Sequence, residues 1–211
     1  MLRYIYGSEL ARYPLLEGTM FRDRAVQFAD RMKWEVSVDE NGWERDEYDA
    51  LDPLYVIWVN PDGGHGGSMR FLPTTERTMV REHFATLLNG ADIRSPFIWE
   101  CTRFCLGQKS TPRVAAALML AGGELMRAFS LTQLLGVFDP RMVRIYAMIG
   151  ASPEVLGSMG VGRDKISVGL WPFRPHDRLR VLRRAGLSSE ISEHWFDRSF
   201  GHAVQEIRKA A

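Results

Sequence analysis

The sequence of 211 residues contains only two cysteines, Cys101 and Cys105. Two cysteines do not provide the disulfide framework of a small secreted domain, and without a histidine cluster nearby they do not predict a zinc site. No segment has the pattern of a signal peptide, and no apolar run approaches the roughly 20 residues of a membrane-spanning helix. We therefore expect a cytoplasmic protein with no membrane partner and no metal.

Neither sign of charge dominates, because 27 lysines and arginines stand against 26 aspartates and glutamates. This balance gives no reason to expect a nucleic-acid partner or a disordered tail. Internal repeats, linkers and low-complexity segments are also lacking. Since 45% of the residues are hydrophobic, we expect a single domain over residues 1–211 with one sizeable core.

Hydrophobic periodicity and turn residues predict an α/β fold, in which one sheet carries helices on both sides. Strands are expected over residues 1–6, 54–60, 67–72, 96–105, 142–148 and 165–170, and the second and third of these form a hairpin. Helices are expected over residues 9–32, 113–129 and 154–159. Residues 78–88 are expected to be a short helix or irregular, and residues 173–185 and 189–211 to be partly helical.

Polar and aromatic residues follow one another in a specific order through the first half of the sequence. The pieces are Arg24-x3-Phe28-x5-Trp34, Asp46-Glu47-Tyr48-Asp49, Gly67-Ser68-Met69-Arg70-Phe71-Leu72-Pro73-Thr74-Thr75, Phe84, and Trp99-Glu100-Cys101-Thr102-Arg103-Phe104. Together they resemble the acyl-homoserine lactone synthases, the autoinducer synthase family of quorum sensing. The resemblance covers most of residues 20–105, and the second half is similar only in layout. Thr102 departs from the family, in which a serine is usual.

The resemblance implies a fold similar to the GNAT acetyltransferases, with a central mixed, twisted sheet, helices on both faces and splayed central strands. It also implies transfer of an acyl group from an acyl carrier protein or an acyl-CoA thioester to the amine of S-adenosylmethionine. Lactonisation and release of methylthioadenosine would follow. S-adenosylmethionine is then a substrate, and no metal or redox cofactor is implied. Residues 1–105 would bind S-adenosylmethionine and carry the catalytic groups, and residues 106–211 would hold the acyl chain and phosphopantetheine.

Glu100 lies in the middle of the segment that is most clearly a buried strand. A buried carboxylate needs partners or a raised pKa. By resemblance Glu100 is the candidate general base, while a core ion pair with Arg103 or Arg70 is an alternative compatible with that role. Because Glu100 and Arg103 would face opposite sides of a regular strand, we expect a bulge between them and a parting of two central parallel strands.

The resemblance also assigns the remaining site residues of the first half, and Tyr146, Met148 and Ile149 are candidates because they lie near the strand expected after the long helix. The catalytic candidates are Glu100, Arg103 and Asp46. The candidates for binding S-adenosylmethionine are Arg24, Phe28, Trp34, Asp46, Asp49, Arg70 and Phe84. The candidates for binding the acyl chain and phosphopantetheine are Thr102, Phe104, Tyr146, Met148 and Ile149. Structural roles remain open for several of them: a loop clasp for Asp49 and Arg70, helix packing for Phe28 and Trp34, and core packing for Tyr146, Met148 and Ile149.

Two other functions remain possible at the level of the sequence. An ordinary GNAT-type N-acetyltransferase would need a better phosphate-binding loop than residues 107–110 and would not need the Arg24, Phe28, Trp34 and Asp46 set. A non-catalytic homologue would be expected to have lost some of the charged residues, which are all present here.

Overall fold

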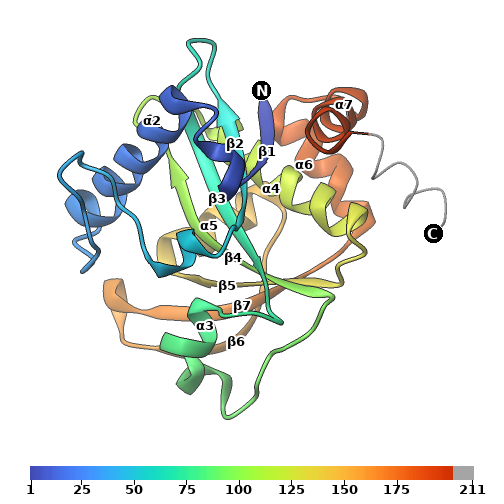
Figure 1. Ribbon diagram of the computed structural model, residues 1–211. Coiled ribbons are helices and arrows are strands. Elements are labelled where there is room, and N and C mark those ends of the chain that lie inside the picture. Colours follow the sequence, from blue (N-terminus) through green and yellow to red (C-terminus); the bar gives the residue numbers. More distant parts are fainter. Residues whose placement is uncertain (202–211) are drawn as a thin grey trace.

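Seven strands form one sheet in the order β1-β2-β3-β4-β5-β7-β6 in the computed structural model, which describes residues 1–201 (Figure 1). The strands are β1 (Leu2–Tyr6), β2 (Leu54–Val59), β3 (His65–Pro73), β4 (Ile98–Leu106), β5 (Gln133–Phe138), β6 (Glu154–Met159) and β7 (Ile166–Pro172). Among the paired strands of residues 1–201, β4 and β5 form the only parallel pair. The expected mixed sheet is therefore confirmed, and the part of the expected segment 189–211 beyond residue 201 lies outside the described residues.

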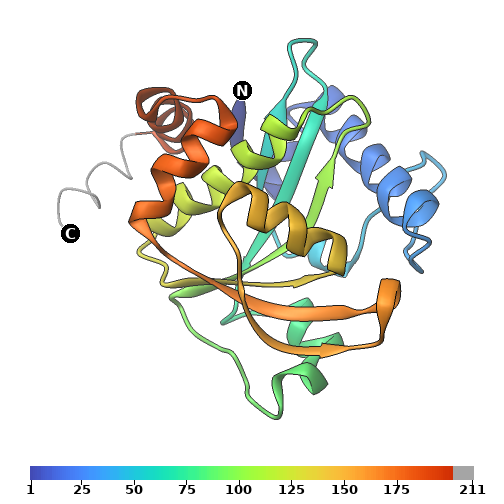
Figure 2. The same ribbon diagram turned by 180° about the vertical axis from the view of Figure 1, so that it is seen from behind.

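Helices cover both faces of the sheet, as expected (Figures 1 and 2). They are α1 (Gly7–Leu10), α2 (Pro14–Ala25), the π-helical turn η1 (Val26–Arg31), α3 (Met79–His83), α4 (Pro112–Ala128), α5 (Pro140–Ile149), α6 (Arg178–Ala185) and α7 (Ser189–Phe200). Short 3-10 turns span Glu47–Ala50, Ala85–Leu88, Gly162–Asp164 and Pro175–Asp177. Within residues 1–201, no helix is both long and apolar enough to cross a membrane.

Alternation along the strands divides the core between the two faces. In β2, Tyr55 and Ile57 pack with α2, whereas Leu54 and Val56 pack with α4 and its neighbours. The α4 face holds the larger cluster, to which α6 and α7 contribute. The largely apolar sequence of α4 is explained by this burial.

The sheet parts at its centre. β4 and β5 pair only from Ile98 to Cys101 on one strand and from Gln133 to Gly136 on the other. Next to the parting, Thr102 of β4 pairs with Arg70 of β3, and Cys105 pairs with Ser68. Two residues of β4, Arg103 and Phe104, therefore lie opposite one residue of β3, Met69. Arg103 adopts a φ of 52°, a left-handed conformation that is uncommon outside glycine. Both the expected bulge and the expected parting are therefore present.

Two expected elements are wrong. The strand expected over 142–148 is part of helix α5, which begins where the Asp139 side chain accepts hydrogen bonds from the amides of Arg141 and Met142. Asp139 followed by Pro140 is a helix-start signal that the apolar run obscured. The helix expected over 154–159 is the edge strand β6, because pairing with β7 overrides local propensity. The strand that precedes α5, β5, was not predicted.

A buried hydrogen-bonded chain joins α2 to β3. The Nδ1 atom of His65 lies 2.7 Å from Oδ2 of Asp23, and Nε2 lies 3.0 Å from Oγ of Ser68. His65 and Ser68 are both buried, and neither lines the cavities described below. We interpret this chain as a structural link between the two elements.

Candidate active site

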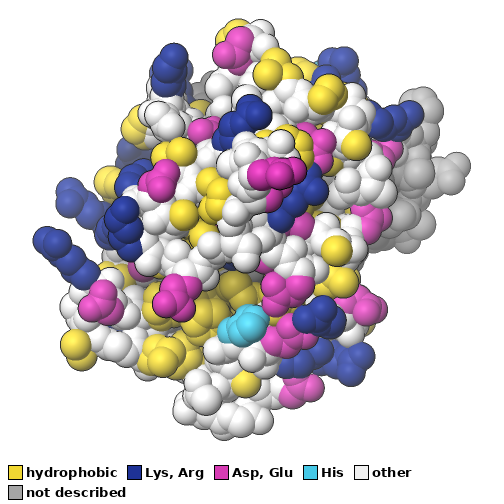
Figure 3. All heavy atoms as spheres, turned by 60° about the vertical axis from the view of Figure 1, so that its left-hand side comes forward, with side chains coloured by type: hydrophobic (Ala, Val, Ile, Leu, Met, Phe, Trp, Pro, Cys, Tyr) yellow, Lys and Arg dark blue, Asp and Glu magenta, His cyan; other side chains and the backbone are white. Residues whose placement is uncertain are grey.

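One cavity lies beside η1, and we call it the π-helix cavity. It has about 1780 Å³ of empty volume. Its walls come from η1 and the segment after it, the 3-10 turn at Glu47–Ala50, α3, the β4 bulge and α5. On the face shown in Figure 3, hydrophobic side chains line a hollow, and acidic side chains lie along its edge. Four of the seven residues expected to bind S-adenosylmethionine, Phe28, Trp34, Asp46 and Phe84, line this cavity.

A network of ion pairs supports the wall of the π-helix cavity. Arg24 binds Asp49 through two parallel hydrogen bonds of 2.9 and 2.8 Å, and its Nε donates to Glu44 at 2.6 Å. Arg70 donates to Asp49 at 2.7 Å and to Thr102 Oγ1 at 3.0 Å. Both guanidinium groups are almost fully buried. Such paired, hydrogen-bonded charges fix the geometry of the wall, and removing one partner would leave a buried charge uncompensated.

Electrostatics within the network favour the charged forms. Burial alone would raise the pKa of Asp49, but the charges of Arg24 and Arg70 outweigh it and hold that pKa well below its usual range. Burial would likewise lower the pKa of Arg24, but Asp49 and Glu44 outweigh it and raise that pKa. Tyr55 adds a hydrogen bond of 2.6 Å to Asp49. The expected loop clasp of Asp49 and Arg70 is therefore formed, and it includes Arg24.

Asp46 and Arg103 belong to the ion-pair network and lie at the surface of the π-helix cavity. Nη2 of Arg103 lies 2.8 Å from Glu44 and 2.8 Å from Asp46. Asp46 also binds Arg70, with Nη2 to Oδ2 at 2.9 Å, and its Oδ1 accepts the amide of Tyr48, which caps the 3-10 turn. Arg103 and Asp46 are 10% and 12% exposed and both line the π-helix cavity. Glu44 lines the cavity as well but is fully buried, so Arg103 and Asp46 are the accessible charged members of the network there.

Two aromatic rings form another part of the wall. Phe28 and Trp34 stack with centroids 5.3 Å apart and an interplanar angle of 12°. The Arg103 guanidinium lies 5.3 Å from the Phe28 centroid on the ring face. Phe28 is buried, whereas Trp34 is 40% exposed. The rings come from η1 and the residues that follow it, and π-helical turns are often found at functional sites.

Glu100 is placed differently from the other site residues. It is 1% exposed, and its carboxylate accepts hydrogen bonds from the amides of Met79 at 3.0 Å and Val80 at 2.7 Å. Burial raises the pKa of Glu100, although these two hydrogen bonds oppose the shift. Glu100 lines neither cavity. Within residues 1–201 it forms no ion pair with Arg103 or Arg70, because those arginines bind Glu44, Asp46 and Asp49.

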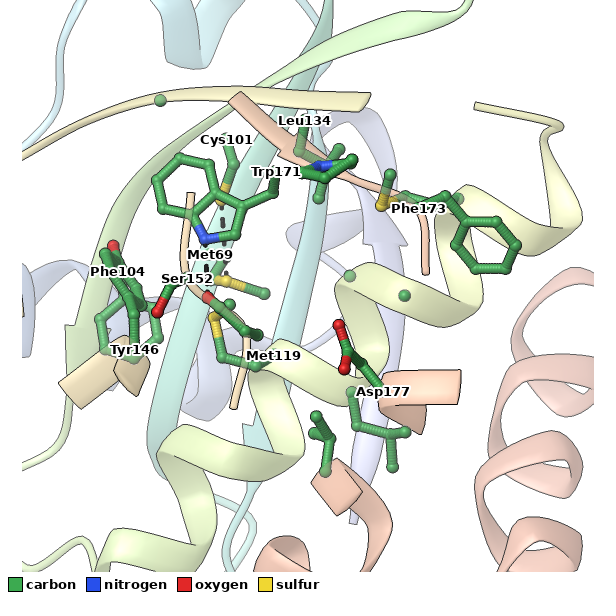
Figure 4. Close-up of a pocket in the computed structure, with 18 of the residues that line it drawn as sticks. Met69, Cys101, Phe104, Met119, Leu134, Tyr146, Ser152, Trp171, Phe173 and Asp177 are labelled. Atoms are coloured by element: carbon green, nitrogen blue, oxygen red, sulfur yellow. Dashed lines mark hydrogen bonds between the residues drawn. The ribbon is translucent and has the colours of Figure 1, made fainter. Parts of the chain in front are cut away.

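A second cavity, which we call the α4 cavity, lies between α4 and the β4–β5–β7 part of the sheet (Figure 4). Its empty volume is about 1050 Å³. Its lining is mainly apolar and includes Met69, Cys101, Met119, Met126, Leu134 and Trp171. Residues that line both cavities are Thr102, Arg103, Phe104, Val137 and Tyr146. The two cavities therefore meet at the bulge, where β4 and β5 part.

Two of the expected acyl-site residues lie away from both cavities. Met148 is 54% exposed and Ile149 is buried in the core, and neither lines the π-helix cavity or the α4 cavity. The reason is the incorrect strand at 142–148, because the helix α5 turns these side chains away. Thr102, Phe104 and Tyr146 do line the junction.

Sequence reasoning missed Glu44, the fully buried carboxylate that joins Arg24 to Arg103. Glu44 lies in an acidic loop with Asp39, Glu40 and Asp46. Nothing in that composition distinguishes it from its neighbours. Its role depends on the fold of the loop, which places its amide 3.1 Å from the carbonyl oxygen of Phe21.

A family model described as autoinducer synthase matches residues 10–181. The chain belongs to the autoinducer synthase family. An acyl-homoserine-lactone synthase of Rhizobium etli is 40% identical over 181 residues, which cover 82% of this chain and 84% of that protein. The chain is thus an acyltransferase of the class that makes acyl-homoserine lactones.

Solved structures of autoinducer synthases are similar in fold. The CoA-dependent acyl-homoserine lactone synthase MesI matches with a TM-score of 0.78 and 22% identity, covering 90% of this chain and 97% of that one. The CoA-dependent synthase BjaI, solved with SAM and isopentyl-CoA, has a TM-score of 0.78 and 22% identity and covers 90% of each chain. The GNAT-like fold that the resemblance implies is confirmed.

Proposed function

We propose that this autoinducer synthase holds S-adenosylmethionine in the π-helix cavity and the acyl chain in the α4 cavity. The observation that carries the proposal is the junction of the two cavities at the β4 bulge. The wall of the π-helix cavity contains aromatic and many charged residues, whereas the wall of the α4 cavity contains few charged residues and is mainly apolar. Their common wall is the place where an amine from one side and a thioester carbonyl from the other can meet, which is the positioning that acyl transfer requires. The structure of BjaI with SAM and isopentyl-CoA supports this pair of substrates.

The cavity walls suit a sulfonium substrate. Aromatic faces attract cations, so Phe28 and Trp34 would hold the sulfonium or stack on the adenine. Asp46 would bind the substrate ammonium and Arg103 the carboxylate, because both are accessible. Arg24, Asp49 and Arg70 are committed to one another, so we assign them a positioning role. Phe84 would close the opposite wall.

Glu100 remains our candidate for the general base. Its raised pKa makes it a better proton acceptor than an exposed carboxylate. Because its hydrogen-bond donor Met79 lines the π-helix cavity, a proton would reach Glu100 past that segment or through a water molecule. Asp46, which is nearer to the cavity, would hold the ammonium until it loses that proton.

The reaction then proceeds in two steps. Glu100 accepts one proton from the substrate ammonium, the resulting amine attacks the thioester carbonyl, and the second proton that the nitrogen loses passes to the pantetheine sulfur, which leaves as a thiol. The substrate carboxylate next attacks its own γ-carbon, the bond from that carbon to sulfur breaks, and neutral methylthioadenosine leaves as the lactone closes. S-adenosylmethionine is a substrate here, and both steps balance without a redox cofactor or metal.

The donor is a thioester on a phosphopantetheine arm, carried by an acyl carrier protein or by CoA. Backbone amides freed where β4 and β5 part would bind the pantetheine amides and the developing oxyanion. We also propose that residues 1–211 work as one domain in the cytoplasm, with residues 1–105 supplying most of the S-adenosylmethionine site. Residues 106–211 supply most of the acyl site, and the bulge residues Thr102 and Phe104 belong to both.

The test is to incubate the purified chain with S-adenosylmethionine and either acyl-CoA or acyl carrier protein thioesters. We expect free thiol, methylthioadenosine and acyl-homoserine lactone in equal amounts by mass spectrometry. Thiol release with another amine but not with S-adenosylmethionine would instead support an N-acetyltransferase. No thiol release with any donor or amine would support a non-catalytic homologue.

A further inference from the structure

Two adjacent glycines, Gly122 and Gly123, lie in the interior of the 17-residue helix α4. Glycine in a helix interior costs about 1 kcal/mol relative to alanine, because it loses more backbone entropy on folding. Each of these glycines therefore needs a reason in packing or in function.

Gly122 has a packing reason. A Cβ atom at this position would lie 3.4 Å from Cδ1 of Leu134 and 3.8 Å from Cζ of Phe71. Both side chains belong to the sheet, so Gly122 lets α4 lie close against it.

Gly123 has no such reason. A Cβ atom there would have no heavy atom within 4 Å outside the local helix, and the backbone of Gly123 is not in the left-handed region. Alanine would therefore fit the fold at this position and would strengthen the helix. The fold therefore does not require glycine at position 123, and the reason for it lies in the cavity beside it.

The open space next to Gly123 belongs to the α4 cavity. Met119 lies one turn earlier on the helix and Met126 one turn later, and both also line the cavity. At these spacings of four and three residues, the three positions share one face of the helix. The missing side chain of Gly123 thus leaves a gap between two methionines.

Figure 4 shows how this gap lies along the cavity. Phe104 and Tyr146, which also line the π-helix cavity, lie at one end with Met119, and Phe173 and Asp177 lie at the other. Helix α4 runs from Met119 toward the second end. Gly123 is therefore further from the junction of the cavities than Met119 is.

The far end of the cavity is held in place by an ion pair between α4 and α6. Arg178, which lines the cavity, binds the buried Glu124 with Nη2 to Oε1 at 2.7 Å and Ser189 at 2.6 Å. This contact ties the start of α6 to α4 beside the cavity.

We propose that Gly123 is a specificity-determining residue, which leaves room for the acyl carbons remote from the thioester and so admits medium-chain and long-chain acyl groups. The proposal rests on the proposed function, since it takes the α4 cavity as the acyl site. The predicted order is simple: the larger the side chain at position 123, the shorter the longest acyl group accepted.

The experiment compares wild type with Gly123→Ala, Gly123→Val and Gly123→Leu. Each purified enzyme is assayed with S-adenosylmethionine and with butanoyl, octanoyl and dodecanoyl thioesters of whichever carrier supports wild-type turnover. We expect kcat/KM for dodecanoyl relative to butanoyl to fall stepwise, by about tenfold or more in Gly123→Leu, the scale at which a filled apolar pocket discriminates methylenes. Butanoyl turnover and the KM for S-adenosylmethionine should stay within about twofold.

Arg113→Leu is the matched control, because it places a leucine on the same helix at an exposed position that lines neither cavity. It should keep the wild-type ratio, and the melting temperature of Gly123→Ala should not fall. An unchanged ratio in Gly123→Leu, an equal loss with all three donors, or a wild type confined to butanoyl would overturn the proposal. A wild type that makes no lactone from any donor refutes the proposed function instead.

Discussion

Glu100 caps the helix that contains Val80: its Oε1 accepts the Val80 amide at 2.7 Å, while Oε2 accepts the Met79 amide at 3.0 Å. This contact joins the middle of the central strand β4 to α3. Because Met79, His83 and Phe84 line the π-helix cavity, Glu100 sets the position of one cavity wall. A carboxylate placed in this way has a structural role as well as the catalytic role that we propose for it.

Replacing Glu100 with glutamine should separate these roles. We expect Glu100→Gln to lower acyl transfer by about 100-fold or more, the usual effect of losing a general base. The KM for S-adenosylmethionine should change little, because the glutamine oxygen still accepts one amide of α3. Glu76→Gln, an exposed carboxylate in the preceding turn, is the control for the same chemical change. Near-normal turnover of Glu100→Gln would remove Glu100 as the base.

The difference in stability between wild type and Glu100→Gln should depend on pH. Since burial raises the pKa of Glu100 in the folded state, ionisation of the carboxylate costs stability. That cost is absent below the unfolded-state pKa and grows as pH rises through the folded-state value. Melting temperatures from about pH 4 to about pH 8 should therefore shift in favour of Glu100→Gln relative to wild type. A shift in the opposite direction would contradict the burial argument.

Asp49→Asn should destabilise the protein through its buried arginines. Arg24 and Arg70 would lose a charged partner, and breaking a buried pair in this way costs about 3–5 kcal/mol. Because the pKa of Asp49 is lowered in the folded state, its contribution is present above the unfolded-state pKa and is lost as pH falls toward the folded-state value. Urea unfolding should show a large difference from wild type at neutral pH and a smaller one in strong acid. Glu40→Gln, in the exposed part of the same loop, should have little effect at either pH.

Trp34→Ala should act on substrate binding. The Trp34 ring stacks on Phe28, and we propose that it also contacts the substrate sulfonium. Its loss removes about 1 kcal/mol of binding, so the KM for S-adenosylmethionine should rise about fivefold at little changed kcat. Trp34→Phe should restore most of the affinity. Phe97→Ala, which removes an exposed ring that lines neither cavity, is the control. A loss confined to kcat would place Trp34 in the chemical step instead.

The Asp23–His65–Ser68 chain has the connectivity of a hydrolytic triad, yet Ser68 is buried away from both cavities. We therefore expect Ser68→Ala to lower the free energy of unfolding by about 1 kcal/mol, as for the loss of one hydrogen bond. Lactone synthesis should be unchanged. Hydrolysis of an activated ester by wild type that disappears in Ser68→Ala would show that the chain is catalytic.

Much of the fold was predictable from local patterns. The β2–β3 hairpin and helix α4 have strong turn and capping signals. The bulge at Arg103 was predicted from the premise that Glu100 and Arg103 reach one cleft, and it is present although only Arg103 lines the cavities. The two errors, at 142–148 and 154–159, have one origin: short apolar runs fit a helix or a strand equally well. Only the pairing of β6 with β7 and the cap at Asp139 decide between them.

The site residues that belong to the ordered motif from Arg24 to Arg103 were predictable from the sequence. Arg24, Asp49 and Arg70 meet as one ion-pair network, and Asp46 and Arg103 join it. The burial of Glu100 was predicted, but its position under α3 was not, because its partners there are backbone amides that carry no residue signature. Glu44 was missed because its role comes from the loop conformation alone.

The π-helical turn η1 separates the two tasks of one continuous helix. Up to Ala25 the helix packs on the sheet, and from Val26 to Arg31 it has the wider turn that directs Phe28 to the cavity. A residue deleted within η1 would rotate everything after it by about 100° relative to α2. This segment should therefore accept many substitutions but no change in length. Among relatives of this enzyme, we expect insertions and deletions in η1 to mark a changed amine substrate rather than a changed stability.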